Sequence, residues 1–221
     1  MKKLLVLTLF TAFLFNKLTA QTEQGGTIIG ISSSFGLLNL ENGSSLSGFS
    51  FSRIKLKSDV TGFDPGEPDK QTRFNLTPRI GYFVIDNLSV GLDITLSTTV
   101  NKSGDIDLKE SNNFLLAGPF VRYYIPTDKV FPFVEVSGAL GGLTSKTEGS
   151  DSFFNEDRED KSSLRTILGG AGMAVPLGDK VLFDFMVGYS SLFVKQREDN
   201  PENFRTLINS FGFRFGFAVV L

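Results

Sequence analysis

Six charged residues are the best placed in this chain to do chemistry, because each shares a strand face with small residues inside an alternating run. They are Arg79, Asp93, Arg122, Glu135, Asp184 and Arg214. Three are basic and three are acidic, so their charges can balance. A charge left unpaired in a confined space is costly, whereas neighbours of opposite sign compensate each other. We predict a salt-bridge network, and a gated path for ions or protons is the alternative role.

The spacing of these charges about the predicted turns indicates which of them pair. In each of three hairpins, one acid and one base lie at similar distances from the connection. The predicted pairs are Arg79 with Asp93, Arg122 with Glu135, and Asp184 with Arg214.

The chain offers few side chains suited to catalysis or metal binding, because it contains no His and no Cys. His is the commonest general base and the commonest metal ligand. Lipase, palmitoyltransferase and protease sites rest on a His, so we expect no enzymatic activity and no cofactor. A carboxylate cluster is the alternative site for a divalent cation; it comprises Glu148, Asp151, Glu156, Asp157, Glu159 and Asp160. Its spacing lacks the alternation and central Gly of a calcium loop, so we expect a solvated acidic loop and no metal.

The elements that must position the charges are strands, because the chain alternates with a period of two. Eight strands are predicted, at 26–38, 72–85, 88–100, 112–125, 130–145, 162–175, 181–194 and 205–221. The connections alternate between tight turns, at 86–87, 126–129 and 176–180, and long loops, at 39–71, 101–111, 146–161 and 195–204. This is the layout of an outer-membrane barrel, with both termini at the short-turn end. Segment 47–57 also alternates, and we interpret it as part of a strand-like first loop.

The last strand indicates which face of the wall meets lipid. Phe211, Phe213, Phe215 and Phe217 share one face, whereas Arg214 lies among glycines on the other. Bulky apolar groups outside and small or charged groups inside describe a membrane barrel. We predict an all-β fold, an eight-stranded antiparallel up-and-down transmembrane barrel. The inward glycines, including Gly81, Gly91, Gly118 and Gly188, are expected to leave room for the long charged side chains, and Tyr82, Tyr123 and Tyr124 to contribute to an interfacial girdle.

The N-terminus and the charge balance restrict location and partners. Residues 1–20 have the basic start, short apolar run and small residue of a secretory signal peptide, which leaves 21–221 as one barrel domain. Removal of Lys2, Lys3 and Lys17 from the 22 basic residues leaves 19 against 24 acidic ones, a net charge of −5. That balance argues against nucleic acid as a partner.

Five features of the sequence resemble one family. They are the runs at 76–92, 118–124 and 131–135, the final Phe-Gly-Phe repeat and the signal-peptide end at Ala20-Gln21. It is the outer-membrane beta-barrel domain family common in Bacteroidetes, related in architecture to OmpA- and OmpX-like small barrels. The resemblance covers essentially the mature chain, without the peptidoglycan-binding domain that some relatives append. It implies insertion by the barrel assembly machinery, for which the last strand is the recognition signal. That signal comprises Phe211, Phe213, Phe215, Phe217 and Leu221, where Leu221 replaces the usual aromatic residue.

The function expected from these features lies in the outer membrane of a Gram-negative bacterium. We expect a monomer in contact with outer-membrane lipid and lipopolysaccharide, with a structural or surface-interaction role through long extracellular loops. The extracellular partner is not identified by the sequence. One alternative is a narrow channel or carrier for ions or small solutes. Another is a soluble, lipocalin-like ligand binder in the periplasm.

Overall fold

The computed structural model describes residues 22–37, 49–54, 69–103, 108–127, 129–149, 158–197 and 205–221, so the predicted signal peptide at 1–20 lies outside the described residues. Nine strands form one sheet within these ranges. They are β1 (Thr27–Phe35), β2 (Phe49–Ile54), β3 (Asp69–Ile85), β4 (Leu88–Lys102), β5 (Leu108–Tyr124), β6 (Phe131–Gly149), β7 (Arg158–Pro176), β8 (Val181–Gln196) and β9 (Thr206–Val220). Among the described residues, no helix has the length and apolar character needed to cross a membrane.

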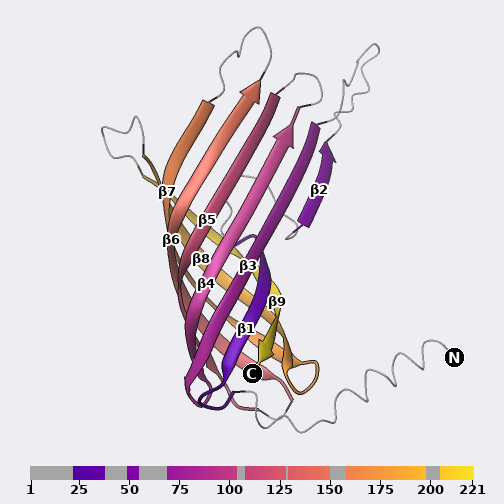
Figure 1. Ribbon diagram of the computed structural model, residues 1–221, viewed down its shortest axis with the longest axis vertical. Helices are drawn as coiled ribbons and strands as arrows, with labels where there is room; N and C mark the ends of the chain where they lie inside the picture. Colours follow the sequence, from indigo (N-terminus) through magenta and orange to yellow (C-terminus); the bar gives the residue numbers. More distant parts are fainter. Residues whose placement is uncertain are drawn as a thin grey trace, which may run out of the picture.

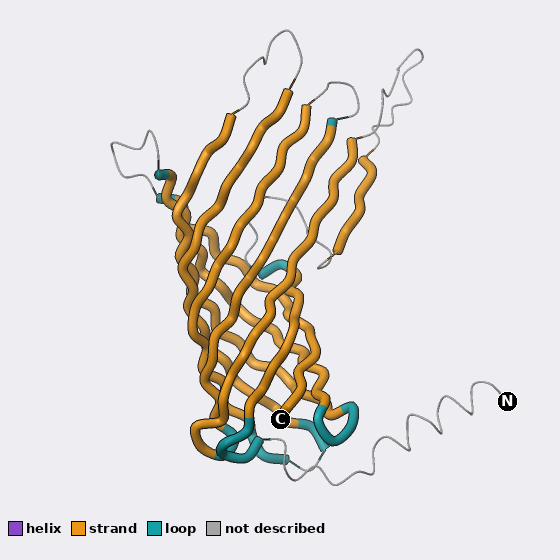
Figure 2. Tube along the Cα trace, in the orientation of Figure 1, coloured by secondary structure: helices purple, strands orange, loops and turns teal. Residues whose placement is uncertain are grey.

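Eight of the strands close into an antiparallel barrel, as Figures 1 and 2 show. Consecutive strands pair from β3 to β9, and β1 closes the ring by pairing with both β9 and β3. Ile28, for example, lies opposite Val220 on one side and Gly81 on the other. In the lower part of the ring, closure gives every wall strand a partner on each side, so the wall presents no free edge there. The predicted fold is confirmed.

β2 stands outside this ring. It pairs with the upper part of β3, from Phe49 opposite Phe74 to Ile54 opposite Asp69. β1 pairs with the lower part of the same edge of β3, as far as Ser32 opposite Thr77. The two strands therefore follow one another along β3 (Figure 1). The interpretation of 47–57 as a strand-like part of the first loop agrees with this arrangement, because the closed ring keeps an even number of strands.

The wall strands continue well beyond the length that a bilayer requires. β3 to β9 contain 15 to 19 residues each, whereas about 9–11 tilted residues cross the hydrocarbon core. The upper parts of β3 to β7 rise above the ends of β1 and β9 in Figure 1. The predicted loops at 101–111 and 146–161 are accordingly shorter, because strand pairing continues to Lys102 opposite Lys109 and to Thr147 opposite Arg158.

The other end of the barrel is closed by tight turns. Asn87 has a φ of 65°, the left-handed conformation that Asn tolerates better than most residues and that a two-residue hairpin needs. The C-terminus lies at this end as well, where the Thr27 amide donates to the Leu221 carbonyl at 2.9 Å. Figure 1 shows the C-terminus among the short turns.

The outer face of the wall is apolar, as alternation in the sequence predicts. Phe211 and Phe217 expose 67% and 52% of their surface, while Arg214 between them is buried. Tyr82 and Tyr123 also face outward near the short-turn end, in agreement with a girdle. The prediction is wrong for Tyr124, which is fully buried inside the barrel. Adjacent residues of a strand point to opposite faces, so Tyr123 and Tyr124 cannot both face lipid.

Candidate functional site

All six predicted lumen charges point into the barrel and are buried there. Six different strands supply them: β3 carries Arg79, β4 Asp93, β5 Arg122, β6 Glu135, β8 Asp184 and β9 Arg214. Each occupies an inward position of its strand, between apolar outward neighbours such as Phe213 and Phe215 around Arg214. We call these six residues the charge network.

Glu135 is the centre of the charge network. Its side chain is completely buried, and its two oxygens accept hydrogen bonds from three arginines. Arg122 Nε donates to Oε2 at 2.7 Å, and Arg79 Nη1 donates to the same oxygen at 3.0 Å. Arg214 Nη2 donates to Oε1. Three cations around one carboxylate would leave a buried excess of positive charge, so two further carboxylates are needed nearby.

Asp93 supplies one of these carboxylates. Arg79 binds it with two parallel bonds, Nε to Oδ1 at 3.0 Å and Nη2 to Oδ2 at 2.7 Å. This bidentate geometry fixes both planes and is among the strongest hydrogen-bonded pairs in proteins. The Arg79 guanidinium also lies 4.3 Å from the centre of the Phe120 ring, a cation–π contact. Arg214 Nη1 approaches Asp93 Oδ2 from the other side at 3.7 Å.

Asp184 supplies the other carboxylate, and its partner differs from the predicted one. Its Oδ2 accepts a hydrogen bond from Arg122 Nη1 at 2.5 Å, so it pairs with Arg122 rather than with Arg214. The reason is register: Asp184 lies opposite Gly216 on β9, whereas Arg214 lies opposite Met186. Arg214 is therefore two residues further from the short turns than Gly216, the residue opposite Asp184. Its side chain extends across the lumen to Glu135.

An aromatic layer beneath the charge network was missed by the sequence reasoning. Tyr124 and three phenylalanines fill the short-turn end of the lumen. The ring centres of Phe83, Phe131 and Phe133 lie 5.7 to 6.5 Å from that of Tyr124. Arg122 stacks on this layer, 3.9 Å from the centre of the Phe133 ring, and its Nη1 donates to Tyr124 Oη at 3.0 Å. Strand parity contained the signal, because Phe131 and Phe133 share the inward face of Glu135.

Polar and apolar layers follow on the long-loop side of the charge network. Hydroxyl groups come first, with Thr77 Oγ1 and Thr95 Oγ1 in contact at 3.2 Å. A cavity of about 30 Å³ lies beside this layer, bordered by Asp93 and Arg214 among others. Further up, four apolar side chains pack together inside the wall: Phe114, Leu116, Leu164 and Leu192. The interior is therefore filled by side chains in successive layers.

Two of the inward glycines, Gly81 and Gly91, leave room for groups other than the predicted charged side chains. A Cβ atom on Gly81 would lie 2.8 Å from Phe120 Cζ, whereas one on Gly91 would lie 2.1 Å from the Ile80 carbonyl oxygen. Gly81 makes room for the ring under Arg79, and Gly91 makes room for the backbone of β3, rather than for a charged side chain. Gly30 is a glycine that touches the charge network, because its Cβ would lie 3.0 Å from Arg79 Cγ.

Two members of the predicted acidic cluster, Glu148 on β6 and Glu159 on β7, are paired with lysines. Glu148 accepts from Lys109 Nζ at 2.8 Å, and this exposed hydrogen bond lowers the pKa of Glu148. Glu159 lies 3.0 Å from Lys146 and 3.1 Å from Lys161, and its hydrogen bonds to them lower its pKa as well. Three further members, Asp151, Glu156 and Asp157, lie outside the described residues. In the part of the chain that is described, no group of three or more metal-ligating side chains occurs.

Comparison with known proteins finds similarity at the level of the barrel alone. No family model matches the chain, and no curated protein matches its sequence. A major outer membrane protein from Thermus thermophilus aligns with a TM-score of 0.44 and 9% identity, over 90% of this chain and 100% of its own. Pseudomonas aeruginosa OprG gives 0.42 and 17%, over 90% and 97%. The N-terminal barrel domain of P. aeruginosa OprF gives 0.41 and 11%, over 90% and 98%. At these values, function does not carry over to this chain.

Proposed function

We propose that this chain is an outer-membrane barrel whose lumen is plugged by the charge network and whose role is structural or surface-interacting. Its long loops then face the exterior of a Gram-negative cell, and it needs neither catalysis nor a cofactor. The observation that carries the proposal is the burial of Glu135 under three arginines, directly above an aromatic layer. An eight-stranded barrel is only wide enough to be filled by side chains.

The energetics of the charge network support a permanent plug rather than a gate. Removing one partner from a buried ion pair leaves an uncompensated charge and costs about 3–5 kcal/mol. Glu135 has three such partners, and Arg122 has two carboxylates. The 30 Å³ cavity beside the charge network has room for about one water molecule, which is too little for a hydrated ion.

The outward apolar surface disfavours the lipocalin-like alternative. A soluble ligand-binding barrel keeps its apolar groups inside around a cavity and presents polar groups to water. Here the outer wall carries exposed Phe211, Phe217 and Leu140, and the inside carries the charges. The same outward stripe supports the proposal that the closing strand carries the assembly signal, which comprises Phe211, Phe213, Phe215, Phe217 and Leu221.

Planar-bilayer recording tests the plug. The folded, unmodified chain is expected to show no steady conductance, because the charge and aromatic layers fill the lumen. Glu135→Ala removes the centre of the charge network but leaves the aromatic layer, so this variant is expected to stay closed as well. Lys109→Ala removes an exposed charge as the matched control. Steady conductance of the unmodified chain, raised further by Arg122→Ala or Arg214→Ala, would contradict the plug and favour a gated ion channel.

A further inference from the structure

A hollow on the outer surface of the wall combines an apolar floor with basic side chains. It has a volume of about 1030 Å³ and runs over β5 to β8. Its floor includes Pro119, Leu140, Ile167 and Phe193, all outward-facing and exposed. Gly138 also lines it and adds no side chain to the floor. A lipid-facing wall of large side chains would be convex, so this concave stretch departs from the rest of the belt.

Four basic side chains border the hollow: Arg165, Lys195, Arg197 and Arg205. No acidic side chain is among the described residues that line it. The Arg197 guanidinium folds back over the outer face of the sheet, where Nε donates to Ser163 Oγ at 2.9 Å. A Cβ on Gly142 of β6 would lie 3.7 Å from Arg197 Nη2, an ordinary van der Waals distance, so the guanidinium lies directly beside this residue. This one exposed hydrogen bond directs the Arg197 side chain toward β7.

The basic residues mark the upper border of the apolar belt on three adjacent strands. Outward positions stay uncharged up to Ile167 on β7, Phe193 on β8 and Leu207 on β9. The next outward position towards the long loops is basic in each case: Arg165 on β7, Lys195 on β8, and Arg205, which directly precedes β9. Register aligns the strand ends, because Phe193 lies opposite both Arg165 and Leu207.

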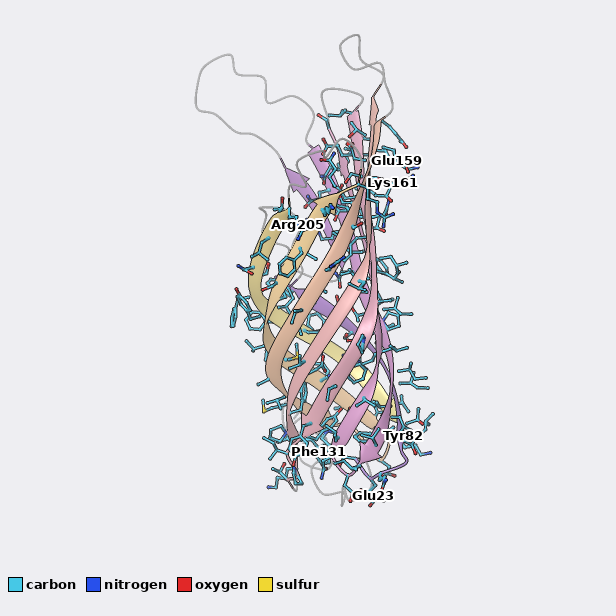
Figure 3. All side chains as sticks on the ribbon, turned by 90° about the vertical axis from the view of Figure 1, so that its left-hand side faces the viewer. Glu23, Tyr82, Phe131, Glu159, Lys161 and Arg205 are labelled. Atoms are coloured by element: carbon cyan, nitrogen blue, oxygen red, sulfur yellow. The ribbon has the colours of Figure 1, made fainter. Side chains whose placement is uncertain are left out.

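This border lies toward the long-loop end, where the headgroups of one leaflet are expected. Figure 3 shows Arg205 towards the long-loop end, far from Tyr82 and Phe131 at the short turns. Long basic side chains at such a border lay their stems along apolar surface and keep their charges among the headgroups. Anionic headgroups are attracted to clustered Lys and Arg at a membrane surface.

The geometry points to a binding site for one phosphorylated glycolipid of the outer leaflet, of the lipid A type. Its phosphates meet Arg165, Arg197 and Arg205, and one acyl chain lies in the hollow against Leu140 and Ile167. Charge complementarity selects an anionic headgroup, and the apolar floor selects a lipid over a free phosphate. This inference rests on the proposed outer-membrane location, because only there does the long-loop end face such a leaflet.

Lipid A binding to the folded chain in neutral detergent micelles tests the phosphate contacts. Purified bisphosphorylated lipid A is titrated, and the bound fraction is read by native mass spectrometry, with phosphatidylcholine as the zwitterionic comparison. Arg165→Gln with Arg205→Gln is expected to weaken lipid A binding roughly tenfold or more, since charged hydrogen bonds are lost. Lys109→Gln with Lys146→Gln removes the same charge from exposed pairs outside the hollow and is expected to leave binding unchanged.

Filling the hollow tests the acyl contact. A Cβ on Gly138 has its nearest neighbour at 3.7 Å, so Gly138→Leu occupies the hollow without displacing the wall. Gly169→Leu is the control, because its Cβ also has space, at 3.9 Å, but Gly169 does not line the hollow. Gly138→Leu is expected to weaken lipid A binding while leaving binding of the deacylated, phosphorylated disaccharide unchanged. Equal effects of Gly138→Leu and Gly169→Leu would overturn the acyl contact.

Two outcomes separate this inference from the proposed function. Suppose that the unmodified protein and all its variants partition into membranes and change gel mobility on boiling, but lipid A binds no better than phosphatidylcholine. The proposed lipid site is then wrong, and the proposed membrane barrel is unaffected. The same conclusion follows if both double variants bind lipid A equally well. If the unmodified chain stays in the aqueous fraction, the proposed function fails, and the lipid site fails with it.

Discussion

At the scale of single residues, Glu135 decides whether the charges in the lumen stabilise or destabilise the barrel. Its buried carboxylate contacts Arg79, Arg122 and Arg214. A buried ion pair contributes little net stability compared with well-packed apolar groups, because desolvation offsets the attraction. Loss of a single member is different, since it leaves the remaining charges uncompensated. The charge network therefore favours one register of the wall rather than adding much stability.

Glu135→Gln is expected to lower the free energy of unfolding by about 3–5 kcal/mol, because three arginines would then face two carboxylates. Urea unfolding of the folded barrel in micelles, followed by far-ultraviolet circular dichroism, measures this loss. Glu148→Gln is the matched control: its carboxylate pairs with exposed Lys109, and its loss is expected to leave the midpoint unchanged. Equal midpoints for the two variants would show that the charge network does not couple the strands.

At the scale of elements, the seam between β1 and β9 is where the barrel closes. The two strands pair from Ile28 opposite Val220 to Phe35 opposite Phe213. β1 is also the shortest strand of the ring, with nine residues. Gly216 lies at this seam, where a Cβ would be 2.7 Å from Ser32 Cα. The glycine is needed because the backbone of β1 approaches too closely for any side chain.

Gly216→Ala is expected to destabilise the barrel by about 1–3 kcal/mol, because the added methyl must push β1 away from β9. Gly169→Ala is the control, since its Cβ has its nearest neighbour at 3.9 Å. Urea midpoints of the two folded variants give the comparison. A midpoint for Gly216→Ala that matches the control would mean that the seam has more freedom than the described pairing indicates.

At the scale of the whole molecule, the layered interior and the apolar exterior are typical of a barrel whose outer surface contacts lipid. The exposed fractions of Phe211 and Leu140, 67% and 64%, would be unfavourable in water. In a bilayer these same side chains replace water contact with hydrocarbon. The strands also satisfy each other's backbone groups around the ring, which a membrane requires.

The chain is expected to sediment with membranes and to migrate differently on a gel when boiled and unboiled. The reason is that the closed hydrogen-bonded ring resists detergent until heat opens it. Fractionation of expressing cells, followed by electrophoresis of paired samples, makes the measurement. Recovery in the aqueous fraction, with mobility unaffected by boiling, would contradict the membrane barrel and restore the lipocalin-like alternative.

The sequence by itself determined the wall. Period-two alternation in runs such as 211–219 separates lipid-facing from lumen-facing side chains, and strand parity follows directly from backbone geometry. Arg79 and Asp93 lie opposite each other in β3 and β4, as their nearly equal distances from the turn at 86–87 predict. Local pairing of this kind depends on the hairpin alone, so it can be predicted from the sequence without any tertiary information.

Only the tertiary structure decided how the lumen is filled. Asp184 binds Arg122, and Arg214 reaches Glu135 at a distance of 79 residues along the chain. Such contacts cross the barrel between strands that are not neighbours, and they depend on how tilt and stagger bring inward side chains to one height. The hollow beneath Arg197 likewise depends on the curvature of the wall. A linear pattern records which face a residue occupies, but it does not record which residue stands across the lumen.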